Sequence, residues 1–329
     1  MFSTLFRLAG GVAVSSLGAI LGWITYSRTS INHALPLTLP LDVPERTLNA
    51  GLAGRLSYYA DIGGHGRPVL LVHSINAAAS AYEMRPIFEQ LRGKRPVYAF
   101  DLPGFGRSDR PDRMYTIEVY VAAIVAMLEQ INAPEGVDII ALSLGSEFSA
   151  LTALREAKQV HSLVLISPTG FGTRLEGEEE RRMERSRNLY RGFSFPLWSQ
   201  PFFDLLTTRV SINYYLDKVF VGPVDQGLLD YCYVTAHQPG ARYAPLYFVS
   251  GSLFTPSVRE RVYKRVQQPV LVIYDANDDF VSYEELEPFA AKYANWHTVR
   301  LVPSIGMPHF EQPADVVRVI EDFWAASKA

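Results

Sequence analysis

The feature that most constrains the fold is a series of short apolar segments alternating with amphipathic ones from about residue 55 onward. The apolar segments are nearly continuous in hydrophobicity and rich in branched residues, as in "PVLLVHS" (68–74) and "VDIIALS" (137–143). This is typical of strands covered on both faces. The segments between them space apolar residues three and four apart, as in "YTIEVYVAAIVAMLEQI" (115–131), which predicts helices. The alternation predicts an α/β fold with a mostly parallel, doubly wound sheet.

The alternation stops between residues 171 and 265. This region is helical in pattern and rich in aromatic residues, as in "YRGFSFPLWSQPFFDLL" (190–206). We interpret it as a helical cap inserted into a core whose two parts span 47–170 and 266–329. Its aromatic residues are expected to form mainly the core of the cap, with a wall for a hydrophobic substrate as the alternative.

The N-terminal end differs from the rest of the chain. Twenty residues without a charge lie between Arg7 and Arg28, and as a helix they would span about 30 Å, the thickness of the bilayer's hydrocarbon. We therefore expect a hydrophobic helix within 1–30 that anchors the protein in a membrane by a single pass. An extended, proline-punctuated linker over 31–46 would follow it. The alternatives are a cleaved signal, giving a secreted or periplasmic protein, and a buried helix.

Charge and cysteine content exclude several classes of protein. The net charge is only −3 and no basic stripe is present, so we expect no nucleic-acid partner. Cys232 is the only cysteine, which excludes an internal disulfide and a CxxC redox pair. No histidine or carboxylate spacing suggests a metal site, and we expect neither a metal nor a cofactor.

The residues that follow the predicted strands are candidates for a functional site, because ligands of parallel sheets bind beyond the strands' carboxyl ends. Ser143 ends one strand and directly precedes a predicted helix. Its neighbours Ala141 and Gly145 are small, as a sharp turn that exposes a nucleophile requires. A serine that merely caps the helix is the alternative.

Four segments resemble motifs of the α/β-hydrolase fold family, in the family's order and over the chain from about residue 50 to its end. "ALSLG" (141–145) is similar to the family's nucleophile elbow, with Ala in place of the first Gly. "LLVHSINAAAS" (70–80) resembles its oxyanion loop and "FDLPGFGRSDRP" (100–111) its Gly-rich turn. "PVLVIYDANDDFV" (269–281) resembles the strand that delivers the catalytic acid. The resemblance implies a sheet of the α/β-hydrolase type and serine chemistry without a cofactor.

The resemblance also implies a catalytic triad. Ser143 is expected to be the nucleophile, His309 the base and Asp278 the acid, because four residues commonly separate the strand's last aromatic from the acid. Asp275 and Asp279 remain alternatives for the acid.

The base departs from the family pattern. Many relatives carry GHxPHxEQP with a catalytic first histidine, whereas the corresponding position here is Gly306 in "GMPHFEQP". Either His309 takes the role of base or the triad is broken.

The expected oxyanion hole consists of the backbone N–H groups of Ile75 and Leu144. Ser74 stands where the family usually has Gly, which affects the shape of this loop. His73 is expected to shape the loop rather than to transfer protons.

Together these features predict a serine hydrolase that cleaves a small, hydrophobic carboxylic ester through an acyl-enzyme, in the manner of carboxylesterases and lipases. Thioester or carbon–carbon bond hydrolysis would use the same triad. The alternatives without catalysis are a silent ligand-binding member of the fold and an anchored protein whose cap aromatics dock on a partner or on the bilayer.

Overall fold

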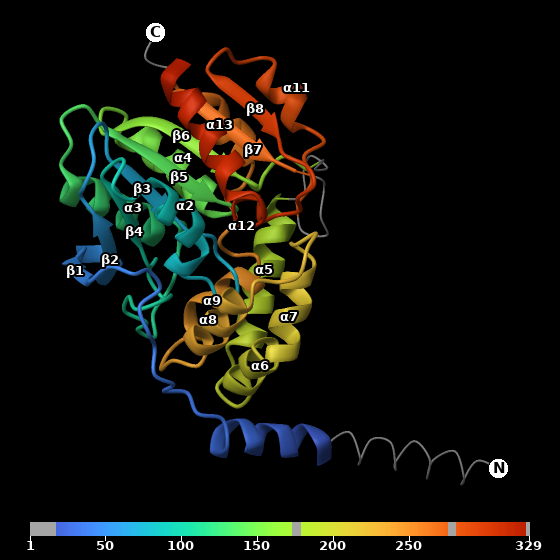
Figure 1. Ribbon diagram of the computed structural model, residues 1–329. Coiled ribbons are helices and arrows are strands. Elements are labelled where there is room, and N and C mark those ends of the chain that lie inside the picture. Colours follow the sequence, from blue (N-terminus) through green and yellow to red (C-terminus); the bar gives the residue numbers. More distant parts are fainter. Residues whose placement is uncertain (1–17, 173–178, 276–280, 327–329) are drawn as a thin grey trace.

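An eight-stranded sheet forms the centre of the core, in the upper part of Figure 1. The computed structural model describes residues 18–172, 179–275 and 281–326. The strands lie in the order β1-β2-β4-β3-β5-β6-β7-β8. They are β1 (Glu45–Asn49), β2 (Arg55–Asp61), β3 (Val69–Val72), β4 (Val97–Phe100), β5 (Val137–Leu142), β6 (Val160–Ile166), β7 (Val270–Tyr274) and β8 (Trp296–Arg300).

The strand directions confirm the prediction of a mostly parallel sheet. β1, β2 and β4 pair antiparallel, whereas every pair from β4 through β3 to β8 is parallel. All six residues of β5 are buried, which explains why the sequence of this strand is almost continuously apolar. The parallel arrangement brings the carboxyl ends of β3, β5, β6 and β7 to the same edge of the sheet.

Helices cover both faces of the sheet. α3 (Ile117–Ile131) and α4 (Gly145–Arg155) pack on one face, in a hydrophobic cluster that includes Tyr120 and Phe148. α2 (Arg85–Leu91) and α13 (Pro313–Ala326) pack on the other face, in a second cluster that includes Phe88 and Ile320. α2, α3 and α13 each bury one apolar stripe, as their three and four spacing predicts. α4 is instead buried over most of its length, polar residues included.

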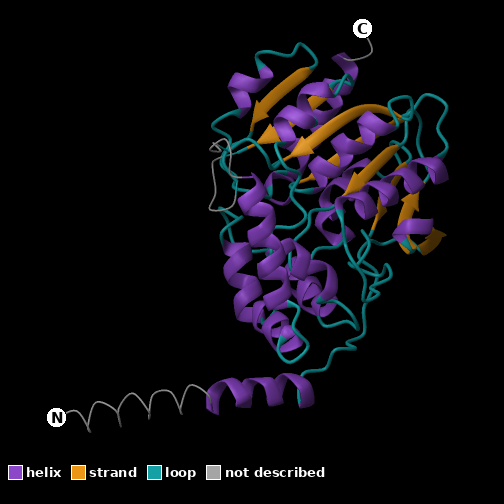
Figure 2. Cartoon of the chain, turned by 180° about the vertical axis from the view of Figure 1, so that it is seen from behind, coloured by secondary structure: helices purple, strands orange, loops and turns teal. Residues whose placement is uncertain are grey.

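A helical insertion separates β6 from β7 and forms the lower body of the molecule, where Figure 2 shows helices but no strand. It contains α5 (Glu179–Phe193), α6 (Ser199–Leu206), α7 (Arg209–Asp217), α8 (Gln226–Ala236), α9 (Tyr243–Val249) and α10 (Val258–Arg261). Aromatic stacking holds it together in part, because Tyr190 and Tyr247 have ring centroids 3.9 Å apart. The predicted helical insertion is therefore present.

The expectation of a transmembrane anchor, and with it of a membrane localisation, is wrong. None of the described helices combines the length and apolarity that a bilayer crossing needs. The described part of the N-terminal helix covers only residues 18–29, about 18 Å at 1.5 Å per residue. The rest of the charge-free stretch, residues 8–17, lies outside the described residues.

Polar contacts attach the N-terminal helix and its following segment to α6, below which they lie in Figure 1. The indole of Trp23 donates to the carbonyl of Pro201 (2.8 Å), and the hydroxyl of Ser27 donates to Asp204 (2.5 Å). The ring of His33 lies 2.9 Å from the same carboxylate, which is buried. Two side chains of the helix and one from the segment after it thus bond to α6.

Candidate active site

Ser143 lies on a sharp turn between β5 and α4. Its φ is 50°, in the left-handed region that residues with a side chain rarely adopt. The backbone N–H of Ser143 donates to the carbonyl of Ile166 (2.9 Å), and its own carbonyl accepts from Ser146 (3.0 Å). The side chain is half-buried, unlike the fully buried residues on both sides of it. A strained serine presented in this way suits a nucleophile better than a helix cap.

Close packing explains the small residue that follows Ser143 by two positions. A Cβ on Gly145 would lie 2.6 Å from the carbonyl oxygen of His73 and 3.3 Å from Cγ1 of Val72. Both obstacles belong to β3 or its end, and the nearer one is backbone. The turn can therefore approach β3 only with glycine at this position.

Two backbone N–H groups at this edge of the sheet, those of Leu144 and Ile75, occupy the sequence positions expected for an oxyanion hole. Leu144 is the first residue after Ser143, and Ile75 follows the end of β3. Within the described residues neither N–H donates a hydrogen bond. Unused donors beside a nucleophile can stabilise the negative charge that develops on an attacked carbonyl oxygen.

His73 is bound entirely by backbone groups. The N–H of Leu102 donates to its Nε2 (2.9 Å), so the ring proton is on Nδ1, which donates to the carbonyl of Ser74 (2.6 Å). Complete burial lowers the pKa of this imidazole to about 3. With both nitrogens occupied, His73 joins the ends of β3 and β4 and has no nitrogen left for proton transfer.

His309 lies in α12 (Pro308–Glu311) and is completely buried. Its Nε2 is 2.8 Å from the carbonyl oxygen of Glu83, which can only accept, so Nε2 carries the proton. Nδ1 then holds the lone pair, and it has no hydrogen-bond partner among the described residues. No hydrogen bond joins His309 to Ser143. Burial lowers the pKa of His309 to about 4 and keeps the ring neutral.

The acid favoured by the sequence, Asp278, lies outside the described residues, as does Asp279. Asp275 is described and buried at the end of β7. Its carboxylate accepts from the N–H of Gly306, which has a φ of 75°, and from the hydroxyl of Ser167 (3.4 Å). Asp275 thus holds the loop that leads to α12.

Sequence reasoning missed two buried glutamates near the turn. Glu147 in α4 accepts from the hydroxyl of Thr169 (2.6 Å) and from the N–H of Thr255 (2.7 Å). It thereby ties the helix after Ser143 to segments at the two ends of the helical insertion. Glu83 lies in the 3₁₀ helix η2 (Ala81–Met84) and contacts the loop that contains Ile75. The sequence does contain one indication of them. Each is the only charged residue in a stretch of apolar or small residues, "SAYEM" for Glu83 and "GSEFSA" for Glu147, where a carboxylate is unusual.

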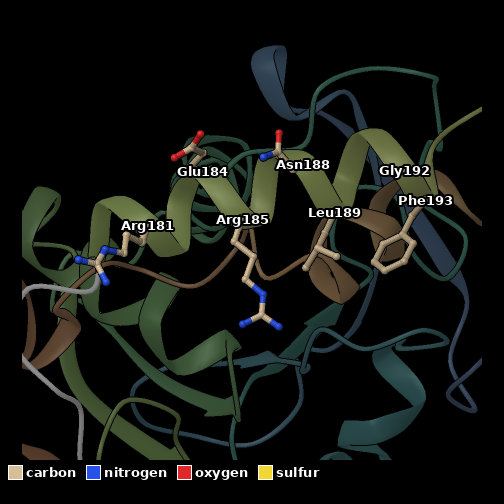
Figure 3. A pocket seen from close by; sticks show the side chains of 7 residues that line it. All are labelled: Arg181, Glu184, Arg185, Asn188, Leu189, Gly192 and Phe193. Carbon is tan, nitrogen blue, oxygen red and sulfur yellow. The ribbon is translucent and has the colours of Figure 1, made fainter.

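A hollow of about 480 Å³ runs along α5 in the helical insertion (Figure 3). Arg185, Leu189 and Phe193 lie one turn apart, and their side chains point to the same side of the helix. The lining of the hollow also includes Arg181 and Glu184, so it combines charged side chains with two apolar ones. All of its described lining residues belong to α5, and Ser143 is not among them.

Comparison with known proteins agrees with this architecture. The model of the alpha/beta hydrolase family matches residues 69–319. A non-heme chloroperoxidase of Streptomyces lividans is 26% identical over 265 residues, which are 77% of this chain and 88% of that protein. The 1-acylglycerol-3-phosphate O-acyltransferase ABHD5 of Homo sapiens is 30% identical over 179 residues, 49% of this chain and only 50% of the relative's length.

A solved structure of similar fold is that of CarC, a serine hydrolase involved in carbazole degradation. The TM-score is 0.68 at 21% identity, over 86% of this chain and 99% of CarC. At this identity the likeness concerns the fold. Because the family model spans most of the chain, the protein belongs to the alpha/beta hydrolase family.

Proposed function

We propose that this protein is a serine hydrolase that cleaves a small, hydrophobic carboxylic ester by transferring the acyl group to Ser143 and then to water. The observation that carries the proposal is the turn at Ser143, with its positive φ and the contact that excludes any side chain larger than hydrogen at Gly145. Backbone strain of this kind is concentrated at functional sites in proteins. Family membership supports hydrolase chemistry, while the ester as substrate is our inference.

The proposed reaction uses His309 as the base. Oγ of Ser143 attacks the carbonyl carbon of the ester, its proton moves to Nδ1 of His309, and the carbonyl oxygen becomes an anion that the N–H groups of Ile75 and Leu144 stabilise. The tetrahedral species collapses, and the alcohol leaves with the proton from His309. Water then attacks the acyl-enzyme by the same steps, releasing the acid and restoring Ser143.

Proton transfer requires the hydroxyl of Ser143 to come within hydrogen-bond distance of Nδ1 of His309. Such bonds often tighten only when the substrate binds, so the reaction requires this contact in the substrate complex. The lone pair on Nδ1 supports the assignment, because it is the form that a general base needs. Asp278 is proposed to stabilise the charged imidazole by its negative charge, since Nε2–H already donates to the carbonyl of Glu83. The aromatic content of the insertion supports a hydrophobic substrate.

Labelling with a fluorophosphonate probe tests the nucleophile. The folded protein should be labelled, and Ser143→Ala should remove the label. A screen of p-nitrophenyl esters of graded chain length then measures turnover and the size of the acyl pocket. Absence of labelling in the folded wild-type protein would overturn the proposal and favour a silent, ligand-binding member of the family.

Histidine and aspartate variants test the other roles. His309→Ala should lower kcat by about 10⁴-fold or more, as losses of catalytic bases do. The exposed His297 on β8 provides the matched control, and His297→Ala should leave kcat unchanged. Single Asp→Asn changes at 275, 278 and 279 identify the acid by the largest loss. Near-normal turnover in His309→Ala would show that another group is the base.

A further inference from the structure

Glu83 is a buried carboxylate with no cationic partner in the part of the chain that the structure describes. Its side chain is 1% exposed, and no lysine or arginine of the described chain forms an ion pair with it. Burial of an unpaired charge is costly unless several hydrogen bonds compensate for it. The position of these hydrogen bonds therefore indicates what the carboxylate does.

Both carboxylate oxygens of Glu83 bind the loop after β3, one on each side of Ile75. Oε2 accepts from the backbone N–H of Ser74 (2.9 Å), and Oε1 accepts from the side-chain amide of Asn76 (2.6 Å). The same amide donates to the hydroxyl of Ser74 (3.0 Å), and its oxygen accepts from the N–H of Ala78 (2.7 Å). These bonds fix the two residues that flank Ile75 and so the direction of the N–H of Ile75 itself.

The backbone of Glu83 contacts the second part of the proposed site. Its carbonyl oxygen accepts from Nε2–H of His309 (2.8 Å), which leaves the lone pair on Nδ1. One residue therefore determines the tautomer of the imidazole and holds the loop that contains an oxyanion donor. Orientation of a base by a third group is a general requirement of serine chemistry.

We propose that Glu83 is a positioning residue of the esterase reaction, which holds the N–H of Ile75 in the direction needed to stabilise the oxyanion. The inference rests on the proposed function. If Glu83 acts in this way, its side chain stabilises the transition state and so affects kcat. It should have little effect on the binding of the substrate in its ground state.

Protonation of Glu83 should weaken this hold. Burial raises the pKa of Glu83 to about 6. Two titratable groups from other elements interact with Glu83: His309 from α12, neutral above about pH 4, and Cys232 from α8, whose thiol pKa burial raises. Below about pH 6 one acceptor oxygen of Glu83 becomes a hydroxyl. Turnover should therefore fall as the pH drops through about 6.

The experiment compares Glu83→Gln with Glu89→Gln, the same change at a partly exposed position on α2. Glutamine keeps the shape of the side chain but offers only one acceptor oxygen, so either Ser74 or Asn76 loses its partner. We expect kcat to fall about 10- to 100-fold with KM within about twofold, since loss of an oxyanion donor costs about 10²- to 10³-fold. The inflection near pH 6 should disappear, while Glu89→Gln should match the wild type.

Asn76→Ala is the second variant, because Asn76 is only half-buried and its truncation removes one of the two contacts without leaving a buried charge alone. It should lower kcat in the same direction while the protein stays folded by circular dichroism. Amide hydrogen exchange over residues 73–80 should become faster in both variants, a result that does not depend on activity.

The two proposals fail in different ways. Wild-type protein without Ser143-dependent turnover removes the proposed function. Wild-type turnover that is unchanged in kcat and in pH profile by Glu83→Gln removes the positioning role of Glu83 and leaves the serine chemistry intact.

Discussion

A methyl group added at Gly145 tests whether the approach of the turn to β3 determines both stability and activity. The new Cβ would lie 2.6 Å from the carbonyl oxygen of His73, whereas carbon and oxygen atoms in favourable contact are about 3.3 Å apart. The start of α4 must therefore move by roughly 0.7 Å from β3 in Gly145→Ala. Overpacking of this kind costs about 1–3 kcal/mol in the free energy of unfolding.

The same displacement should affect catalysis, because Leu144 directly precedes α4 and its N–H would move with the helix. A misplacement of 1 Å can cost about 10²-fold in rate, so we expect a loss of at least about tenfold in kcat. Urea denaturation measures the free energy of unfolding, and turnover of the best p-nitrophenyl ester measures kcat.

Gly192 provides the matched control. It lies in α5, where an added Cβ would meet no atom within 4 Å. Gly192→Ala should keep wild-type turnover and gain up to about 1 kcal/mol in stability, since alanine favours helix over glycine. If Gly145→Ala resembles the wild type in both measurements, the close contact does not restrict this turn and the argument from steric fit is refuted.

Two further predictions concern stability. Asp138→Asn should lower the free energy of unfolding by about 3 kcal/mol in urea denaturation, because it leaves the guanidinium of Arg95, now 2.6 Å from this buried carboxylate, without its partner; a loss below about 1 kcal/mol contradicts this. Stability should also fall as the pH drops from about 6.5 to 4, because His309, with a pKa lowered to about 4, stays neutral when folded but binds a proton when unfolded. The expected contribution is on the order of 3 kcal/mol. It is measured by comparing how the free energy of unfolding changes with pH in the wild type and in His309→Gln, because the opposite contribution of Glu83 is present in both and cancels. Equal slopes in the two proteins would refute the prediction.

The sequence predicted the sheet and the turn at Ser143 because both depend on local patterns. Branched apolar runs such as the one in β5 are typical of parallel strands that are buried on both faces. The small residues Ala141 and Gly145 around Ser143 similarly indicated a sharp turn before any contact was known. The structural role expected for His73 was inferred only from the order of the catalytic residues along the chain. Its two hydrogen bonds to backbone groups are consistent with that role.

The N-terminal segment shows where a local pattern misled. A charge-free stretch of twenty residues satisfies a length criterion for a membrane span, but two residues of its described portion, Trp23 and Ser27, donate hydrogen bonds to α6. Hydropathy counts side chains along the chain and does not register a distant partner such as Asp204. The buried carboxylate of Asp204 accepts a hydrogen bond from Ser27, the last residue of that stretch.

By itself, the sequence determined that the chain forms a doubly wound sheet with a serine on a turn at one edge, because hydrophobic period and the size of neighbouring residues act over a few positions. Only the tertiary structure decided which groups surround that turn. Glu83 and His309 are separated by 226 residues along the chain, and no local sequence pattern around either residue predicts their contact. Their hydrogen bond exists because helices α2 and α13 pack on the same face of the sheet, a consequence of the whole core rather than of any segment.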